Sequence, residues 1–218
     1  MSDKSNKYGY VGVDIPAQSF GANKGVFNPA EINELIADNK WTQYGQLELI
    51  ETQTVSSSTA TVDFTSLGNY NVHFLTVTDL QATGDARVLY LRFSNDGGSS
   101  FISSNYHYAN QEGDSSGTFT EDRSISSVAQ IRIQSGNGGS ASNEVANSYV
   151  YLYNLLDSSK YSFTTQHLTQ LDRDVNYSFN FGSGVLASAD THNAFRLFFN
   201  ADNISKAKFS LYGIKEYS

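Results

Sequence analysis

The sequence has no cysteine, and it has only one methionine and one tryptophan. The absence of cysteine excludes disulfide bonds, thiolate catalysis and cysteine-ligated zinc, while leaving the redox compartment open. Charged residues are also scarce, at 17% of the chain against the roughly 25% of an ordinary domain. The net charge is −8 and no cluster of lysine and arginine occurs, so we expect no binding to nucleic acid through a basic surface.

Long apolar segments are absent as well. The N-terminal residues, MSDKSNKYGYVGVDIP, lack the uninterrupted apolar core of a signal peptide. No apolar run approaches the roughly 20 residues of a membrane-spanning helix, so we expect no membrane insertion. We therefore expect synthesis in a cytoplasm and, if the protein ends up outside a cell, a route other than ordinary secretion, such as assembly into a particle that is released by lysis.

Aromatic and small polar residues are abundant instead. The chain contains 14 tyrosines and 14 phenylalanines against a background of Ser, Thr, Asn, Gln and Gly. This mixture suits half-buried strands with uncharged outer faces. A chain of 218 residues can bury roughly 70% of its unfolded surface, so it needs no metal or disulfide to fold.

From Gln46 onward, apolar and polar residues alternate over short runs that are separated by Gly, Asn, Asp and Ser. The clearest runs are LELIETQTV, YNVHFLTVTDL, ARVLYLRFS, SYVYLYNLL and AKFSLYGIK. A period of two over short runs predicts strands with one buried face. About ten such strands, with no helical crossover between them, predict a mostly β chain with an antiparallel, jelly-roll-like β-sandwich at residues 46–218.

One short helix is predicted in the segment FNPAEINELIADNKW. Asn28 is a suitable cap, Pro29 takes the first helical position and Glu31 can complete a capping box. The apolar residues that fall on one helical face are Ile32, Leu35 and Ile36. Together with the extended arm before it, this helix makes residues 1–45 a separate N-terminal region.

The arm carries large apolar residues that are spaced by glycine and small polar residues, with no helical period. Two interpretations stay open: a disordered terminus, or an arm that docks onto a neighbouring protein. The candidate docking residues are Val11, Val13, Ile15, Phe20, Val26, Phe27 and Trp41. Trp41 is also interpreted as a packing anchor that folds the helix onto the body.

The stretch FSNDGGSSF, residues 93–101, has the Ser-x-Asp-x-Gly-x-Ser-Phe form of the Asp-box turn of sialidases. The chain has one copy and no repeat of propeller type, so we interpret the stretch as a tight hairpin turn between two strands. Two longer stretches, NQEGDSSGTFTEDRS and SGNGGSASNE, are interpreted as surface loops.

No arrangement of catalytic residues stands out in the sequence. The four histidines have no metal-ligand spacing, and His73 is expected on the polar face of its strand. Two acids flank Arg173 in LDRDV, which predicts a turn with local ion pairs. The sequence has no G-x-S-x-G elbow and no phosphate-binding glycine loop. We therefore predict a protein that is not an enzyme and that has no cofactor or metal, with a Ca²⁺ ion at Asp96 or in EGDSSG as an alternative.

The segment NYHYAN places a histidine between two tyrosines. One interpretation is a sugar-stacking surface, and the other is an ordinary exposed strand. The candidate glycan contacts are Tyr106, His107 and Tyr108.

Three segments together resemble virion structural proteins of tailed bacteriophages, particularly small β-rich proteins of marine phages. They are the entry helix region GVFNPAEINELIADNKW, the hairpin LRFSNDGGSSF and the ending KAKFSLYGIKEYS. The resemblance covers most of the chain and lies in the order of these segments within a Ser/Thr/Asn/Tyr-rich background. It implies a non-enzymatic virion component, namely a tail fibre or tail accessory protein, with a capsid decoration (cement) protein as the alternative.

The resemblance also implies partners. These are other virion proteins, a host-surface glycan or receptor, and further copies of the chain. Closed-symmetry oligomers would hide exposed sheet edges, and the resemblance to fibre and decoration proteins favours a trimer. Two other functions compete with this one: a free carbohydrate-binding module, and a glycan hydrolase or lyase, which requires two carboxylates facing a cleft.

Overall fold

The computed structural model describes residues 29–37, 46–134 and 138–216. The chain divides into two units, residues 1–45 and residues 46–218. In the first unit the described part is helix α1 (Pro29–Ala37), which begins at the predicted proline. Ile32 and Leu35 of this helix are half-buried, whereas Ile36 is 45% exposed. The candidate docking residues all lie outside the described residues: they are Val11, Val13, Ile15, Phe20, Val26, Phe27 and Trp41.

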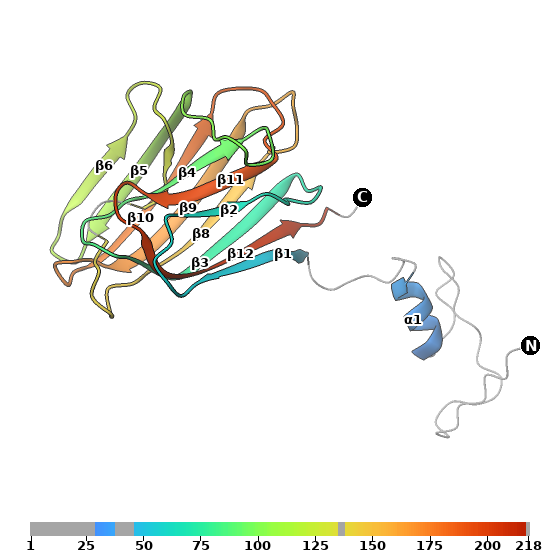
Figure 1. Ribbon diagram of the computed structural model, residues 1–218, viewed down its shortest axis with the longest axis horizontal. Helices are drawn as coiled ribbons and strands as arrows, with labels where there is room; N and C mark the ends of the chain where they lie inside the picture. The colour runs from blue at the N-terminus through green and yellow to red at the C-terminus, as the bar shows by residue number, and fades with distance from the viewer. Residues whose placement is uncertain (1–28, 38–45, 135–137, 217–218) are drawn as a thin grey trace, which may run out of the picture. The chain divides into compact units, whose positions relative to one another are not determined.

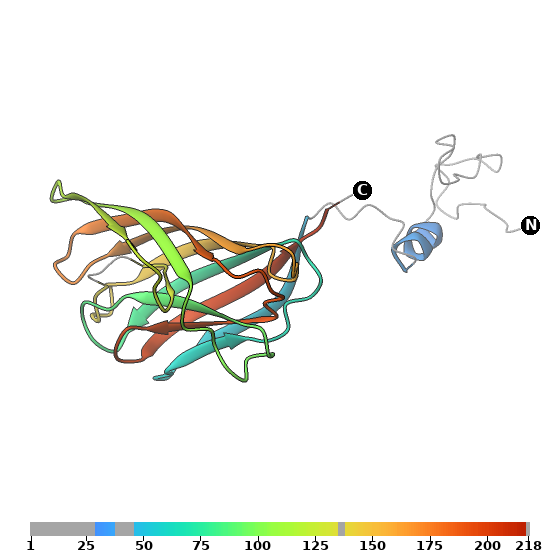
Figure 2. The same cartoon turned by 90° about the horizontal axis from the view of Figure 1, so that it is seen from above.

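The second unit is a sandwich of two antiparallel sheets, as predicted (Figures 1 and 2). The strands of the large sheet are β1 (Leu47–Val55), β3 (Val72–Ala82), β5 (Tyr106–Asp114), β6 (Phe119–Arg123), β8 (Ala146–Tyr153), β9 (Ser162–Leu171), β10 (Tyr177–Leu186) and β12 (Ile204–Ile214). Those of the small sheet are β2 (Thr61–Phe64), β4 (Leu89–Ser94), β7 (Ile131–Arg132) and β11 (Ala194–Phe199). No helix in the described ranges is long and apolar enough to cross a membrane.

The strand order is that of a jelly roll with two insertions. The large sheet has the order β1-β12-β3-β8-β9-β10-β5-β6, and the small sheet has the order β2-β11-β4-β7. The first strand thus pairs with the last, β2 with β11, β3 with β8 and β4 with β7, which is the winding of a jelly roll. The two inserted hairpins, β5–β6 and β9–β10, extend the large sheet beyond β8.

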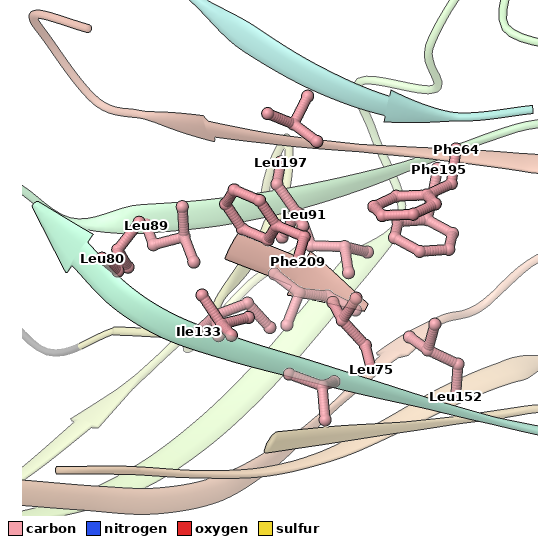
Figure 3. Packing of buried hydrophobic residues seen from close by; sticks show 14 of the residues in the cluster. Phe64, Leu75, Leu80, Leu89, Leu91, Ile133, Leu152, Phe195, Leu197 and Phe209 are labelled. Carbon is pink, nitrogen blue, oxygen red and sulfur yellow. The ribbon is translucent and has the colours of Figure 1, made fainter. Parts of the chain in front are cut away.

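The core lies between the two sheets and comes from the alternation that the sequence shows. Leu91 and Leu197 of the small sheet face Leu75 and Phe209 of the large sheet, and all four side chains are fully buried (Figure 3). Phe64 stacks on Phe195 with ring centroids 4.9 Å apart. Each such side chain contributes about 1.5–3 kcal/mol through burial, which makes this interface the main source of stability.

Beneath the inserted strands, the interior contains polar residues. Asn110 of β5 donates to the carbonyl of Arg132 at 3.1 Å, and Asn180 of β10 donates to the carbonyl of Ile133 at 3.0 Å. Gln166 of β9 donates to Asn110 Oδ1 at 2.9 Å. These side-chain amides satisfy backbone carbonyls at the edge of the small sheet, where the short strand β7 leaves them without a neighbouring strand.

The turn at FSNDGGSSF is a structural device, but it does not join a hairpin. Asp96 accepts hydrogen bonds from the Ser100 hydroxyl at 2.6 Å and the Ser94 hydroxyl at 2.7 Å, and Gly97 and Gly98 adopt positive φ. The strands before and after the turn, β4 and β5, belong to different sheets. The predicted hairpin is therefore wrong: the turn starts a crossing from the small sheet to the large one.

Two further expectations need correction. The segment NQEGDSSGTFTEDRS is not a surface loop, because it contains the end of β5 and all of β6. These two strands pair with each other, from Ala109 with Arg123 to Gly113 with Phe119. His73 does not lie on the polar face of its strand, because it is fully buried and its Nε2 lies 2.8 Å from the carbonyl oxygen of Leu67. The predicted turn at LDRDV is confirmed: Asp172 accepts from the backbone amides of Asp174 and Asn176.

Candidate functional site

The outer face of the large sheet carries a concentration of aromatic side chains on its inserted half. In β8 the sequence SYVYLY points Val150 and Leu152 into the core, so that Tyr149, Tyr151 and Tyr153 point outward. In β10 the same alternation points Phe181 outward, where it is 50% exposed. The tyrosines thus come from β8 and the phenylalanine from β10, and strand β9 lies between these two strands in the sheet (Figure 1).

A line of short side chains crosses the strands between the rings. Strand register places Thr165 of β9 opposite Ser183 of β10, and Ser183 opposite Ala109 of β5. The same row ends at Tyr151 of β8, which pairs with Thr165, and at Arg123 of β6, which pairs with Ala109. Because paired residues share one face of a sheet, these five residues form a continuous row across five strands.

The next row along the strands is a wall of rings and long polar side chains. Its members pair in the order Tyr149, His167, Phe181, Gln111 and Glu121. His167 meets Tyr149 edge-to-face, with ring centroids 5.7 Å apart, and it meets Phe181 in the same way at 6.4 Å. These ring contacts fix the side chains of Tyr149, His167 and Phe181 relative to one another, beside the row of short side chains.

Two open hollows follow this arrangement. One has a volume of about 490 Å³ and is lined by Tyr149, Tyr151 and Tyr153 together with Thr165 and Ser183. The other has a volume of about 340 Å³ and lies over β5 and β6, against Ala109, Glu121 and Arg123. Phe181 and Gly182 line both hollows, so the two hollows adjoin each other. We call the two hollows, together with the row of short side chains that lines them, the trench.

Hydroxyl and imidazole groups stand beside the rings of the trench. The hydroxyl of Tyr153 lies 3.0 Å from the hydroxyl of Thr165, and the hydroxyl of Tyr149 lies 3.5 Å from His167 Nδ1. Charge is confined to the β6 end, where Arg123 and Glu121 lie 3.7 Å apart as an exposed pair. The trench therefore offers ring faces and neutral hydrogen-bonding groups along most of its length.

The floor is held in place from inside the sandwich. Gly182 faces inward over Asn110, and a Cβ atom at position 182 would lie 2.1 Å from Asn110 Oδ1 and 2.3 Å from the carbonyl oxygen of Ala109. Only glycine lets β10 approach β5 this closely. The Asn110 side chain in turn binds Gln166 and the carbonyl of Arg132, so a rigid hydrogen-bonded layer supports the trench.

The aromatic surface continues past the β8 end of the trench. The ring of Phe74 on β3 lies 4.8 Å from that of Tyr151, and the ring of Tyr212 on β12 lies 6.3 Å from Phe74. On the other side, Phe179 meets Phe119 of β6 edge-to-face at 6.2 Å. Phe119 is 68% exposed, but it lines neither hollow of the trench.

The three candidate glycan contacts lie in three different environments. Tyr106 is fully buried, and its hydroxyl accepts a hydrogen bond from the backbone amide of Phe93 at 2.7 Å, so it belongs to the core. Tyr108 is half-buried and packs against the core, where burial raises the pKa of its phenol. His107 is exposed on the same outer face as the trench, but it lines neither hollow.

Ser162 and His192 have side chains of the kinds used in catalysis, but they lie inside the fold rather than in the trench. Ser162 Oγ lies 2.7 Å from His192 Nδ1, but both residues are fully buried and the imidazole stacks on Phe93 at 5.7 Å. Burial lowers the pKa of His192, so this imidazole stays neutral inside the fold. Within the described ranges, no group of three or more His, Asp or Glu side chains is arranged to hold a metal ion.

The carboxylates that flank the inserted hairpin also have partners. Asp122 lies 2.7 Å from the guanidinium of Arg132, and Glu112 lies 3.9 Å from it, on the inner side of the sheet. Asp96 is engaged in its own turn, and hydrogen bonds from Ser100 and then Ser94 lower the pKa of its carboxyl to about 2. The site that the structure presents most clearly is therefore the trench, which offers ring faces and hydrogen-bonding groups on one open surface.

The trench residues were visible in the sequence as alternation but not as a site. SYVYLY and YSFNFG place tyrosines and phenylalanines two residues apart, hence on one face of each strand. What the sequence does not show is that β8, β9, β10, β5 and β6 are neighbours. No family model, no curated protein and no solved structure matches the chain.

Proposed function

We propose that this protein is a non-enzymatic binding protein whose β-sandwich holds a carbohydrate chain in the trench. The observation that carries the proposal is the row of short residues, Thr165, Ser183 and Ala109, bounded by rings and lined by neutral hydrogen-bonding groups. Sugars present apolar faces and many hydroxyls. A site that combines aromatic surface with a few placed polar groups matches both.

The sequence resemblance supplies the biological setting of the proposal. As a virion component of a tailed phage, associated with the tail, the protein would carry its trench to a glycan of the host surface. The division of the chain into two units, residues 1–45 and residues 46–218, supports this proposal, in which the first unit attaches and the second binds. Other virion proteins are then the partners of the first unit.

A glycan array tests the binding proposal, with the full-length protein and two variants. Phe181→Ala removes a ring that both hollows share, and we expect it to weaken binding about tenfold or more, which corresponds to about 1.4 kcal/mol. Phe119→Ala removes a comparably exposed ring outside the trench and should leave binding unchanged. Equal losses in both variants, or release of sugar products by the wild type, contradict the proposal.

The virion setting has its own test. Deletion of residues 1–45 is expected to abolish incorporation into phage particles while leaving the far-ultraviolet circular dichroism of the sandwich and its glycan binding intact. Incorporation of the shortened chain at the wild-type level would show that attachment does not depend on this unit.

A further inference from the structure

We propose that the trench binds an internal segment of a neutral, linear polysaccharide, laid lengthwise across the strands. The inference rests on the proposed function and specifies its ligand. It follows from three properties of the trench: its direction, its ends and its charge.

The direction is given by strand register. Tyr151, Thr165, Ser183, Ala109 and Arg123 occupy matching positions on five consecutive strands, so the row runs perpendicular to them. Five strands make four spacings of about 4.8 Å, or about 19 Å in total. A single sugar ring fills only a fraction of this length, so full occupation requires several linked rings in an extended chain.

The trench is open to solvent at its β6 end, and at its β8 end the aromatic surface continues onto the next strands. At the β6 end Arg123 lies on the edge strand with 64% of its side chain exposed, so solvent lies beyond it. At the β8 end the trench leads onto the rings of Tyr151 and Phe74, which extend the aromatic surface toward β12. A site for a terminal sugar needs a closed end that excludes the next residue of the chain. A trench with these two ends accepts a chain that enters and leaves.

The charge of the trench favours a neutral ligand. The row of short residues and the ring wall from Tyr149 to Gln111 contain no lysine, arginine or carboxylate. The Arg123–Glu121 pair at the β6 end brings one charge of each sign, 3.7 Å apart. An acidic polysaccharide would meet no unpaired cation here, and the protein as a whole carries a net charge of −8, which repels it.

The test is a length series with defined probes. Isothermal titration of the full-length protein is carried out with linear neutral oligosaccharides, from disaccharide to hexasaccharide, of the sugar class found on the array, and with polygalacturonate as an acidic polymer. We expect affinity to rise at least about tenfold over the series and then to level off. The hexasaccharide affinity should change little between low and moderate salt, because salt screens interactions between charges and this ligand carries none.

A blocking variant separates lengthwise binding from other causes of a length effect. Ala109 is exposed and lines the second hollow, so Ala109→Tyr fills the trench at β5 without changing the core. The variant should bind the hexasaccharide no better than wild type binds a short oligosaccharide, while its disaccharide affinity in the first hollow stays unchanged. Ala109→Ser, which keeps the side chain short, should behave as wild type.

Each outcome is decisive. Length-dependent binding that Ala109→Tyr removes supports the inference. A disaccharide that binds as tightly as the hexasaccharide overturns lengthwise binding but retains carbohydrate binding. Preference for polygalacturonate with a steep salt dependence overturns the neutral ligand. No binding to any array glycan overturns the proposed function and the inference together.

Discussion

The replacement Tyr106→Phe tests how the two sheets are joined where the inserted hairpin leaves the jelly roll. The Tyr106 hydroxyl on β5 accepts the backbone amide of Phe93 on β4 at 2.7 Å, and both residues are fully buried. Phenylalanine keeps the ring and its contact with Phe93, at 6.2 Å between centroids, but removes the acceptor. The Phe93 amide is then left in an apolar interior without a partner, which costs about 1–3 kcal/mol.

The assay is guanidinium unfolding followed by far-ultraviolet circular dichroism. A loss of about 2 kcal/mol shifts the midpoint by roughly 0.5 M if the slope m is about 4 kcal/mol/M. Burial raises the pKa of the Tyr106 phenol, so ionisation does not complicate a measurement near neutral pH. The matched control is Tyr161→Phe, at a tyrosine that is 47% exposed, which should leave the midpoint unchanged. Equal midpoints for Tyr106→Phe and wild type, with the same m, would refute the reasoning.

Two further predictions concern the trench floor and the turn. Gly182→Ala places a methyl group against Asn110 Oδ1 and a backbone carbonyl. We therefore expect a loss of about 1–3 kcal/mol in the free energy of unfolding, measured by guanidinium titration. The control Ser183→Ala, on the outward side of the same strand, should lower the free energy of unfolding little. The pKa of Asp96 is about 2 in the folded protein and about 4 in the unfolded chain. Its carboxylate therefore stabilises the fold at pH values above about 4, and this contribution is lost as the pH falls toward 2. The melting temperature of Asp96→Asn should therefore depend less on pH than that of wild type between about pH 5 and about pH 2, and parallel curves would contradict this account.

The fold class could be predicted because one face of most strands is apolar. Runs such as ARVLYLRFS and SYVYLY specify which side chains enter the core, and the solvent-facing positions follow from a period of two. The short helix could be placed because proline at its first position is a local signal. Both features depend on residues close together in the sequence.

The features that were mispredicted depend on long-range pairing or on interior polarity. A turn-forming segment such as NDGG specifies a bend but not whether the flanking strands pair, and here they enter different sheets. The charged strand β6 looks like a loop because only its partner β5 and the edge position make it a strand. His73 and Tyr106 look exposed because both are polar, but each has a buried backbone partner that only the folded structure supplies.

The trench could not be predicted for the same reason. Thr165, Ser183 and Ala109 are ordinary residues in three separate segments of the sequence, and they become one surface only through the pairing of β9 with β10 and of β10 with β5. The insertion of two hairpins into the jelly roll is thus what creates the site. The sequence contains the rings, and the topology arranges them.

In the proposed function, the trench is the surface that binds the carbohydrate. The most direct test is to follow the backbone amide resonances of the isotope-labelled full-length protein while an array-positive oligosaccharide is added. We predict that the largest chemical-shift changes occur at Thr165, Ser183 and Ala109, on three adjacent strands of the large sheet. Saturable changes centred on the small sheet or on residues 1–45, with these three amides unmoved, would contradict the account.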